Sequence, residues 1–252
     1  MPFGIGIGAV IGLVRETRDL DESSAPLTVS GPGARELADA LAAGGDPSAV
    51  AVDGDPLRAA VAIRLVDGDP SEAETSVLRR ISRAAIPVIV VRRHGGGHIP
   101  HVLSRDVLES GVDLPVAAVV TAIAHAASDA APSLAARLPV LRPAVSRQLV
   151  TMTALTNAAI AGSPFERKAH LPLLTLAQSR MVLQLGRSRG DVLPRDPKAL
   201  AVAVGPAIVG SLAMGLGARA LVRRSPVQGP VVRAAIAYAG TRVLGAAARF
   251  SP

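Results

Sequence analysis

Short apolar runs alternate with helical stretches over the first 130 residues of the chain. The runs are bounded by glycine, proline and acidic residues, which predicts strands. They occupy residues 26–30, 49–52, 59–66, 86–91 and 101–103. Helical composition marks residues 34–43, 71–83 and 114–127. Because predicted strands and helices alternate, the pattern indicates an α/β domain with a small parallel sheet, whose ligands would bind at the carboxyl ends of the strands.

The helix predicted over residues 71–83 has residues at both ends that favour a helix terminus there. Ser71 is a favoured N-cap residue, and Glu72 and Glu74 lie in the first turn after it. Arg80 and Arg83 lie near the other end, which is the charge order that the helix dipole favours. The helix is therefore predicted to begin directly after Ser71.

No strand pattern appears after residue 131, where the chain becomes rich in alanine and glycine. Helices are predicted over residues 134–161, 173–189, 198–223 and 230–249, separated by glycine- and proline-containing breaks. Pro139 and Pro143 should kink or delay the first of them. The second half is therefore predicted to be an all-α domain of the four-helix type.

Charge divides the chain at about the same place. Residues 1–130 carry 11 basic and 17 acidic residues, whereas residues 131–252 carry 16 basic and 3 acidic residues. The predicted organisation is an N-terminal helix and linker (1–25), an α/β domain (26–130) and a basic helical domain (131–252). The N-terminal apolar run is too short to cross a bilayer and lacks a positive start, so a cytoplasmic protein is expected.

Composition excludes several kinds of chemistry. The chain has no cysteine, which excludes disulfides, thiolate metal sites and cysteine nucleophiles, and only 2% aromatic residues. Nucleic-acid binding is not favoured, because stacking residues are scarce and no helix-turn-helix, zinc or RNP signature accompanies the basic charge. The partners that this charge favours are an anionic membrane surface or an acidic protein.

The first domain resembles the Era-like class of GTPases in the order of its features. The sequence PLTVS leads into a glycine turn and a helix. A later strand, within AIRLVDGDP, ends in an acid, and AIPVIVV stands where the base-reading strand would be. A phosphate loop, however, needs a lysine and a hydroxyl that the turn lacks. Gly31, Gly33 and Asp67 are therefore candidates for a remnant anion or nucleotide loop, in a domain predicted to have no catalytic residue and no cofactor.

Three other interpretations of this domain stay open. It could be a purely structural sheet whose glycines only make a tight turn, or a small nucleotide-binding hydrolase with a non-standard phosphate loop. His94, His98 and His101 lie close enough in sequence for a transition-metal site. A solvated loop is the favoured interpretation, because Arg92 and Arg93 would repel a cation, and no metal is predicted.

The helical half resembles the GTPase-associated helical domain called domain of unknown function 697, some of whose members are bacterial inner-membrane proteins. The stretches LPLLTLAQSRMVLQL and AIAYAGTRVLGAAARF carry the likeness. Its key positions are Pro172, Gln178, Met181, a turn at Tyr238-Ala239-Gly240-Thr241, and Gly245. The resemblance implies an architecture and a GTPase-type neighbour, and no reaction.

Residues 199–218 are uncharged, mostly apolar and long enough to span a bilayer. Their small and helix-breaking residues mark either a membrane segment or a close helix contact: Gly205, Pro206, Gly210, Gly215 and Gly217. The expectation is a non-catalytic protein whose basic helical domain associates with the inner membrane, at its cytoplasmic face or within it, or with a partner protein. A soluble scaffold is the alternative.

Overall fold

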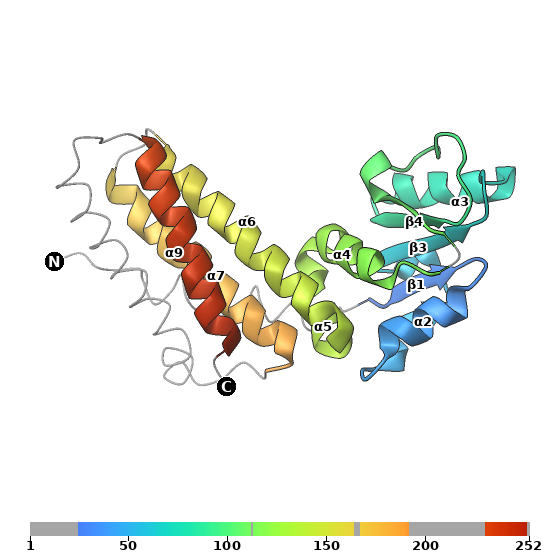
Figure 1. Ribbon diagram of the computed structural model, residues 1–252, viewed down its shortest axis with the longest axis horizontal. Coiled ribbons are helices and arrows are strands. Elements are labelled where there is room, and N and C mark those ends of the chain that lie inside the picture. Colours follow the sequence, from blue (N-terminus) through green and yellow to red (C-terminus); the bar gives the residue numbers. More distant parts are fainter. Residues whose placement is uncertain (1–24, 112, 164–166, 192–229, 251–252) are drawn as a thin grey trace. The chain divides into compact units, whose positions relative to one another are not determined.

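The computed structural model describes residues 25–111, 113–163, 167–191 and 230–250 (Figure 1). The chain divides by compactness into two units, and the division falls between Val145 and Ser146. The predicted N-terminal helix and the predicted helix over residues 198–223 lie outside the described residues. Each unit is considered by itself.

The first unit contains a five-stranded sheet in the order β2-β1-β3-β4-β5, and every neighbouring pair is parallel. The strands are β1 (Leu27–Ser30), β2 (Val50–Val52), β3 (Val61–Val66), β4 (Val88–Arg92) and β5 (Val107–Glu109). This order is one of the two common ones in doubly wound sheets, where the switch in winding direction lies between β1 and β3. The predicted parallel sheet is confirmed.

Helices cover both faces of this sheet (Figure 1). On one face, α3 (Glu72–Arg83) covers an apolar cluster that includes Val66, Leu78 and Val90. On the other, α2 (Ala34–Ala42) packs on β1 and β2, and α4 (Val116–Ala126) packs on β4 and on α2. Alternate residues of each strand therefore point to different helices, and both sides are buried, as parallel sheets require.

The start of α3 is as predicted, whereas the last strand is not. The Ser71 hydroxyl accepts a hydrogen bond of 3.2 Å from the backbone N–H of Glu74, which confirms the N-cap. The predicted strand at 101–103 is wrong, because His101 has a φ of 66° and the chain turns there. The strand that pairs with β4 is instead β5.

The segment between residues 131 and 145 packs with the α/β unit. It forms α5 (Ala131–Arg137), a short 3-10 turn at Pro139–Leu141 and the start of the next helix, so the chain breaks at Pro139 as expected. Arg137 forms an ion pair of 2.9 Å with Asp46, just after α2, and its carbonyl accepts the Asp46 N–H at 2.8 Å. Packing thus divides the chain later than the charge boundary at residue 130.

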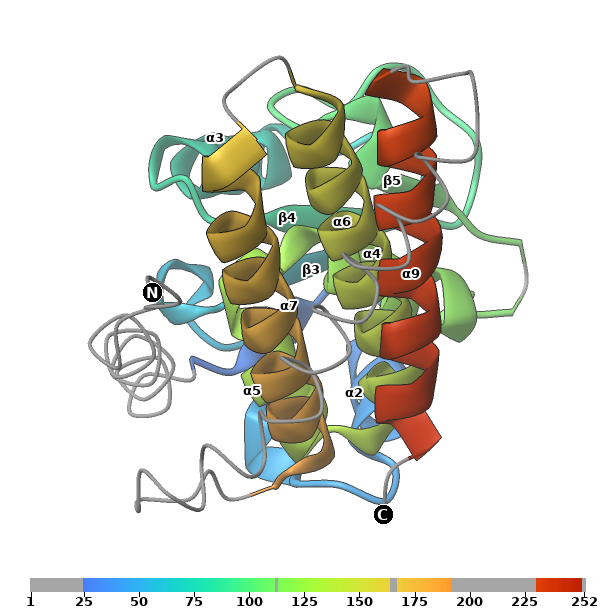
Figure 2. The same cartoon turned by 90° about the vertical axis from the view of Figure 1, so that its left-hand side faces the viewer.

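In the second unit, three long helices lie side by side: α6 (Arg142–Gly162), α7 (Arg167–Arg189) and α9 (Pro230–Phe250) (Figures 1 and 2). Val150 of α6 and Met181 and Leu185 of α7 form a buried core, against which Leu244 and Ala248 of α9 pack. The structure therefore confirms an α/β part and a helical part.

Candidate functional site

The carboxyl ends of the strands are where a sheet of this kind binds ligands. Here β1 runs into the turn Gly31-Pro32-Gly33, and both glycines have positive φ, 106° and 82°. A Cβ at Gly31 would lie 2.1 Å from the carbonyl oxygen of Leu65 in β3. Only glycine fits at this position, because both the backbone angle and the closeness of β3 exclude a side chain.

Arg93, directly after β4, lies over this turn. A Cβ at Gly33 would lie 2.6 Å from the Arg93 Nη2 atom and 3.9 Å from the Leu65 Cδ2 atom. The guanidinium therefore packs directly against Gly33, on the side where a side chain would be. The Nε atom of Arg93 is buried without a hydrogen-bond partner. The structure thus brings Gly31 and Gly33 together with a cation from another strand.

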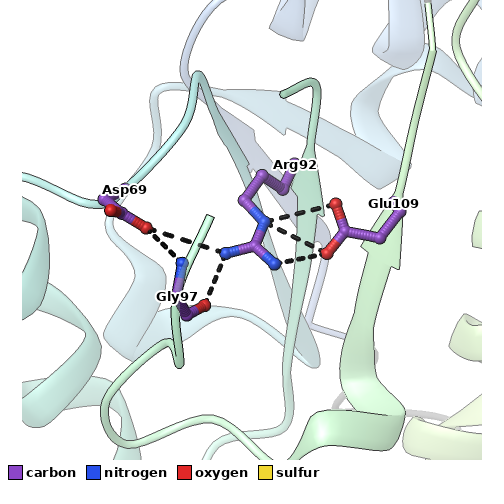
Figure 3. A network of polar contacts seen from close by, with 4 residues as sticks. All are labelled: Asp69, Arg92, Gly97 and Glu109. Atoms are coloured by element: carbon purple, nitrogen blue, oxygen red, sulfur yellow. Dashed lines mark hydrogen bonds and ion pairs between the residues drawn. The ribbon is translucent and has the colours of Figure 1, made fainter. Parts of the chain in front are cut away.

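All three guanidinium nitrogens of the neighbouring residue, Arg92, donate to acceptors in the protein (Figure 3). Arg92, with only 8% of its side chain exposed, forms a forked ion pair with Glu109 of β5 and donates to the carbonyl oxygen of Gly97 at 2.7 Å. Asp69 lies 3.9 Å from the same guanidinium and accepts the Gly97 N–H at 2.8 Å. This network ties the glycine-rich loop and β5 to the end of β4.

The ion pair shifts the titration of both partners. Hydrogen bonds from Arg92 lower the pKa of Glu109 below its usual value, and the same bonds raise the pKa of Arg92. Both groups are therefore charged at neutral pH. The ion pair links the ends of β4 and β5.

Asp67 follows β3 and pairs with the Nδ1 atom of His94. Both side chains are largely exposed, at 62% and 76%. His98 and His101 are also exposed. Over the described part of the chain, no group of three or more His, Asp or Glu residues is placed to hold a metal ion.

The helical unit contains a buried polar cluster that links its three helices. The side-chain amide of Asn157 in α6 donates to the Thr241 hydroxyl of α9 at 2.9 Å, and Gln178 of α7 donates to the same hydroxyl at 3.4 Å. Asn157 and Thr241 are 0% exposed, and Gln178 is 4% exposed. The cluster joins two of the positions that carried the resemblance, Gln178 and Thr241.

The other positions of the resemblance lie on the same two helices. Gly245 packs against Val150, since a Cβ there would be 2.5 Å from its Cγ2 atom, and Met181 is fully buried beside Val150. Pro172 lies within α7, and Tyr238 and Gly240 lie within α9. The expected turn at Tyr238–Thr241 is therefore wrong, because that stretch is helical. Gly205, Pro206, Gly210, Gly215 and Gly217 lie outside the described residues.

The exposed face of α9 is mostly apolar, with the exposed Arg242 as its one charged residue among those described. Val231 is 79% exposed and Val243 is 70% exposed, and the exposed alanines Ala235, Ala239 and Ala246 lie on the same stripe. In the part of the chain that the structure describes, Val231–Ala248 is the one helical segment long and apolar enough to cross a membrane, with a mean hydropathy of 1.2 and 11% of its residues buried.

Sequence reasoning missed two of these residues. Asn157 reads as one polar residue in a helix with three threonines, and only the packing of α6 on α9 shows that it is buried. In the sequence, Arg93 indicates only a charge that would repel a metal cation. Its adjacency to Gly33 depends on the strand order, which no local signal encodes.

No family model matches the chain, and no curated protein or solved structure matches it. The likeness to Era-like GTPases and to the GTPase-associated helical domain therefore stays a prediction from the residues.

Proposed function

We propose that the protein is a non-catalytic, membrane-associated protein whose helical unit contacts lipid through the outer face of α9. The observation that carries this proposal is the distribution of polarity in that unit. Apolar residues such as Val231 and Val243 face outward, while Asn157, Gln178 and Thr241 are buried inside. Lipid would cover the exposed valines, and helices in membranes commonly pair polar side chains such as these with one another at their contacts.

Helix length supports the same contact. A 21-residue helix such as α9 is about 32 Å long at 1.5 Å per residue, close to the roughly 30 Å hydrocarbon layer of a bilayer. α6 and α7 are of similar length, with 21 and 23 residues, but among the described helices only α9 contains a segment apolar enough to span. Burying the face of α9 in lipid would remove Val231 and Val243 from water, and each such side chain gains about 1.5–3 kcal/mol when fully buried.

Charge is compatible with an anionic membrane. Arg242 is exposed on α9 and donates to the Thr151 hydroxyl of α6 at 3.1 Å. A guanidinium at mid-bilayer costs about 2.5–3.5 kcal/mol on insertion scales, a penalty that its long stem reduces by reaching toward the headgroups. The basic excess over residues 131–252 would add attraction to anionic lipids.

The α/β unit in this proposal is a GTPase-type domain that does not hydrolyse nucleotides. Its β1–α2 turn has neither the lysine that would reach the β- and γ-phosphates nor the hydroxyl that would hold magnesium. α2 begins at Ala34, directly after Gly33, and the Arg93 guanidinium lies against Gly33. These features support a domain that has a binding or positioning role and does not carry out phosphoryl transfer.

Fractionation of the expressed full chain tests the membrane contact. We expect the protein to stay with membranes through a high-salt wash and an alkaline wash, because the contact is apolar. Val243→Glu should release a large part of it. Leu103→Glu is the matched control, since Leu103 is 58% exposed on the α/β unit. A full chain that is soluble without detergent, or one released by salt alone, would overturn the proposal.

A further inference from the structure

We propose that the exposed face of α9 around Arg242 binds a transmembrane helix of a partner protein, and that this helix carries a carboxylate near its middle. The inference rests on the proposed membrane contact of α9 and names the partner that shares it. Arg242 is exposed and lies on the same side of α9 as Val231 and Val243. Among the described residues it is the one charged side chain exposed there.

The position of Arg242 along α9 makes its charge unfavourable in lipid. α9 has 21 residues with Gly240 at its middle, so Arg242 lies only two residues past the midpoint. At 1.5 Å per residue, the nearer end of the helix at Phe250 is about 12 Å away. The long stem of an arginine shortens the distance to the headgroups, but in a spanning α9 the guanidinium stays within the hydrocarbon layer.

The described helices supply no carboxylate to neutralise this charge. No acidic residue occurs in α6, α7 or α9. Among the described residues, Arg242 forms no ion pair, and its Nη1 atom donates to the neutral Thr151 hydroxyl. The Nε and Nη2 atoms form the other edge of the guanidinium, the edge with which Arg64 holds Glu74 in the α/β unit by two bonds of 2.7 Å. A carboxylate from outside these helices can bind Arg242 in the same forked way.

Charge also decides which kind of helix fits this face. A second copy of α6, α7 or α9 would bring basic residues against Arg242, because these helices contain basic and no acidic residues. The occupant is therefore a helix of another protein, apolar over most of its length and with one Asp or Glu at the depth of Arg242. Exposed alanines beside Arg242, such as Ala239 and Ala246, leave room for a close approach of its backbone.

A synthetic helix is the probe that tests this. The full chain is reconstituted in phosphatidylcholine vesicles with a leucine–alanine peptide of about 20 residues, which carries a central Glu beside a photo-crosslinking residue. The peptide concentration at half-maximal cross-linking to α9 measures association. We expect the Glu peptide to bind about five- to thirtyfold more tightly than its Gln counterpart, the range for polar contacts between membrane helices. Arg242→Gln should remove this preference, whereas Arg147→Gln, at an exposed arginine near the start of α6, should keep it.

Exchanging the two charges covers the case in which Arg242→Gln does not fold. Arg242→Glu should lose the Glu peptide and bind a peptide with a central Lys more tightly than the parent does. Such a gain of binding cannot come from unfolding. If the parent binds the Glu and Gln peptides equally, or if Arg242→Gln keeps the preference for Glu, the inference is wrong.

Flotation of the same vesicles separates this inference from the proposed function. A chain that floats with the vesicles but does not distinguish the Glu peptide keeps its lipid contact and has no acidic helix as partner. A chain that does not float contradicts both proposals. Vesicles that contain phosphatidylglycerol test lipid headgroups as the other source of negative charge. If Arg242→Gln weakens flotation with these vesicles and leaves peptide binding unchanged, Arg242 binds headgroups and the inference is wrong.

Discussion

Asn157 of α6 donates a 2.9 Å hydrogen bond to the hydroxyl of Thr241 in α9. That hydroxyl in turn donates to the carbonyl oxygen of Ala237, one helical turn earlier, at 2.8 Å. With the amide of Gln178 on the same oxygen at 3.4 Å, one hydroxyl connects α6, α7 and α9. A rotation of α6 or α9 would break the 2.9 Å bond and leave the Asn157 amide buried without its acceptor, so the cluster favours one rotational setting of these helices.

Replacing this hydroxyl should destabilise the helical unit. Thr241→Val keeps the shape of the side chain but leaves the buried Asn157 amide without its acceptor. An unsatisfied buried group costs about 1–3 kcal/mol, and the free energy of unfolding of the full chain in detergent should fall by that amount. Thr121→Val is the control, because the Thr121 hydroxyl also bonds a carbonyl four residues earlier but is exposed. Equal losses in both variants would contradict a role for the cluster.

The contact between Gly245 and Val150 should not tolerate a methyl group. In Gly245→Ala the new Cβ would lie 2.5 Å from the Val150 Cγ2 atom, so α6 and α9 would have to separate. Overpacking of this kind costs about 1–3 kcal/mol in thermal or chemical unfolding. Adding Val150→Ala makes room for the methyl group and should recover part of the loss. A double variant no more stable than Gly245→Ala would show that the two residues do not compete for space.

The N-cap of α3 should be worth a measurable part of the stability of the α/β unit. Ser71→Ala removes the acceptor of the Glu74 N–H, and loss of such a cap costs about 0.5–2 kcal/mol. Urea unfolding measures this difference. Ser76→Ala, at an exposed position inside the same helix, should leave stability unchanged or raise it by a few tenths of a kcal/mol, since alanine favours helix.

The Arg92–Glu109 pair should make stability depend on pH on the acid side. The pKa of Glu109 is lowered in the folded protein by hydrogen bonds from Arg92. The folded state thus gains stability above the unfolded-state pKa, about 4.3, and loses this gain as the pH falls through the lower folded-state pKa. Glu109→Gln should therefore be less stable than the parent at pH 7, with the difference closing in acid. A gap that is the same at pH 7 and pH 3 in thermal unfolding would contradict this.

Much of the α/β unit could be predicted from its sequence, since its elements carry local signals. β4 comes from a β-branched run, α2 and α3 have one apolar face each, and α3 has a cap. β5 could not be found, because it has three residues of mixed polarity and is held by its pairing with β4 and by the ion pair between Glu109 and Arg92. Such a strand depends on a contact seventeen residues away in sequence.

The candidate sites could be predicted only in part. Gly31 and Gly33 were recognisable because positive φ after a strand calls for glycine. Gln178, Thr241 and Gly245 were found through a resemblance, and the structure places Gln178 and Thr241 in one cluster. The roles of Arg93 and Asn157 come from tertiary packing, since each looks like an ordinary polar residue beside its sequence neighbours.

The shortness of the two outer strands has a consequence for handling the protein at high concentration. β2 and β5 lie at the two ends of the sheet order, and each has three residues. Exposed strand edges are templates on which other chains can add strands and aggregate. Here each edge offers only a few unpaired backbone groups, and β5 ends in the charged Glu109. The longer central strands, β3 and β4, are paired on both sides, so we expect the described sheet to offer little edge for fibre-like association.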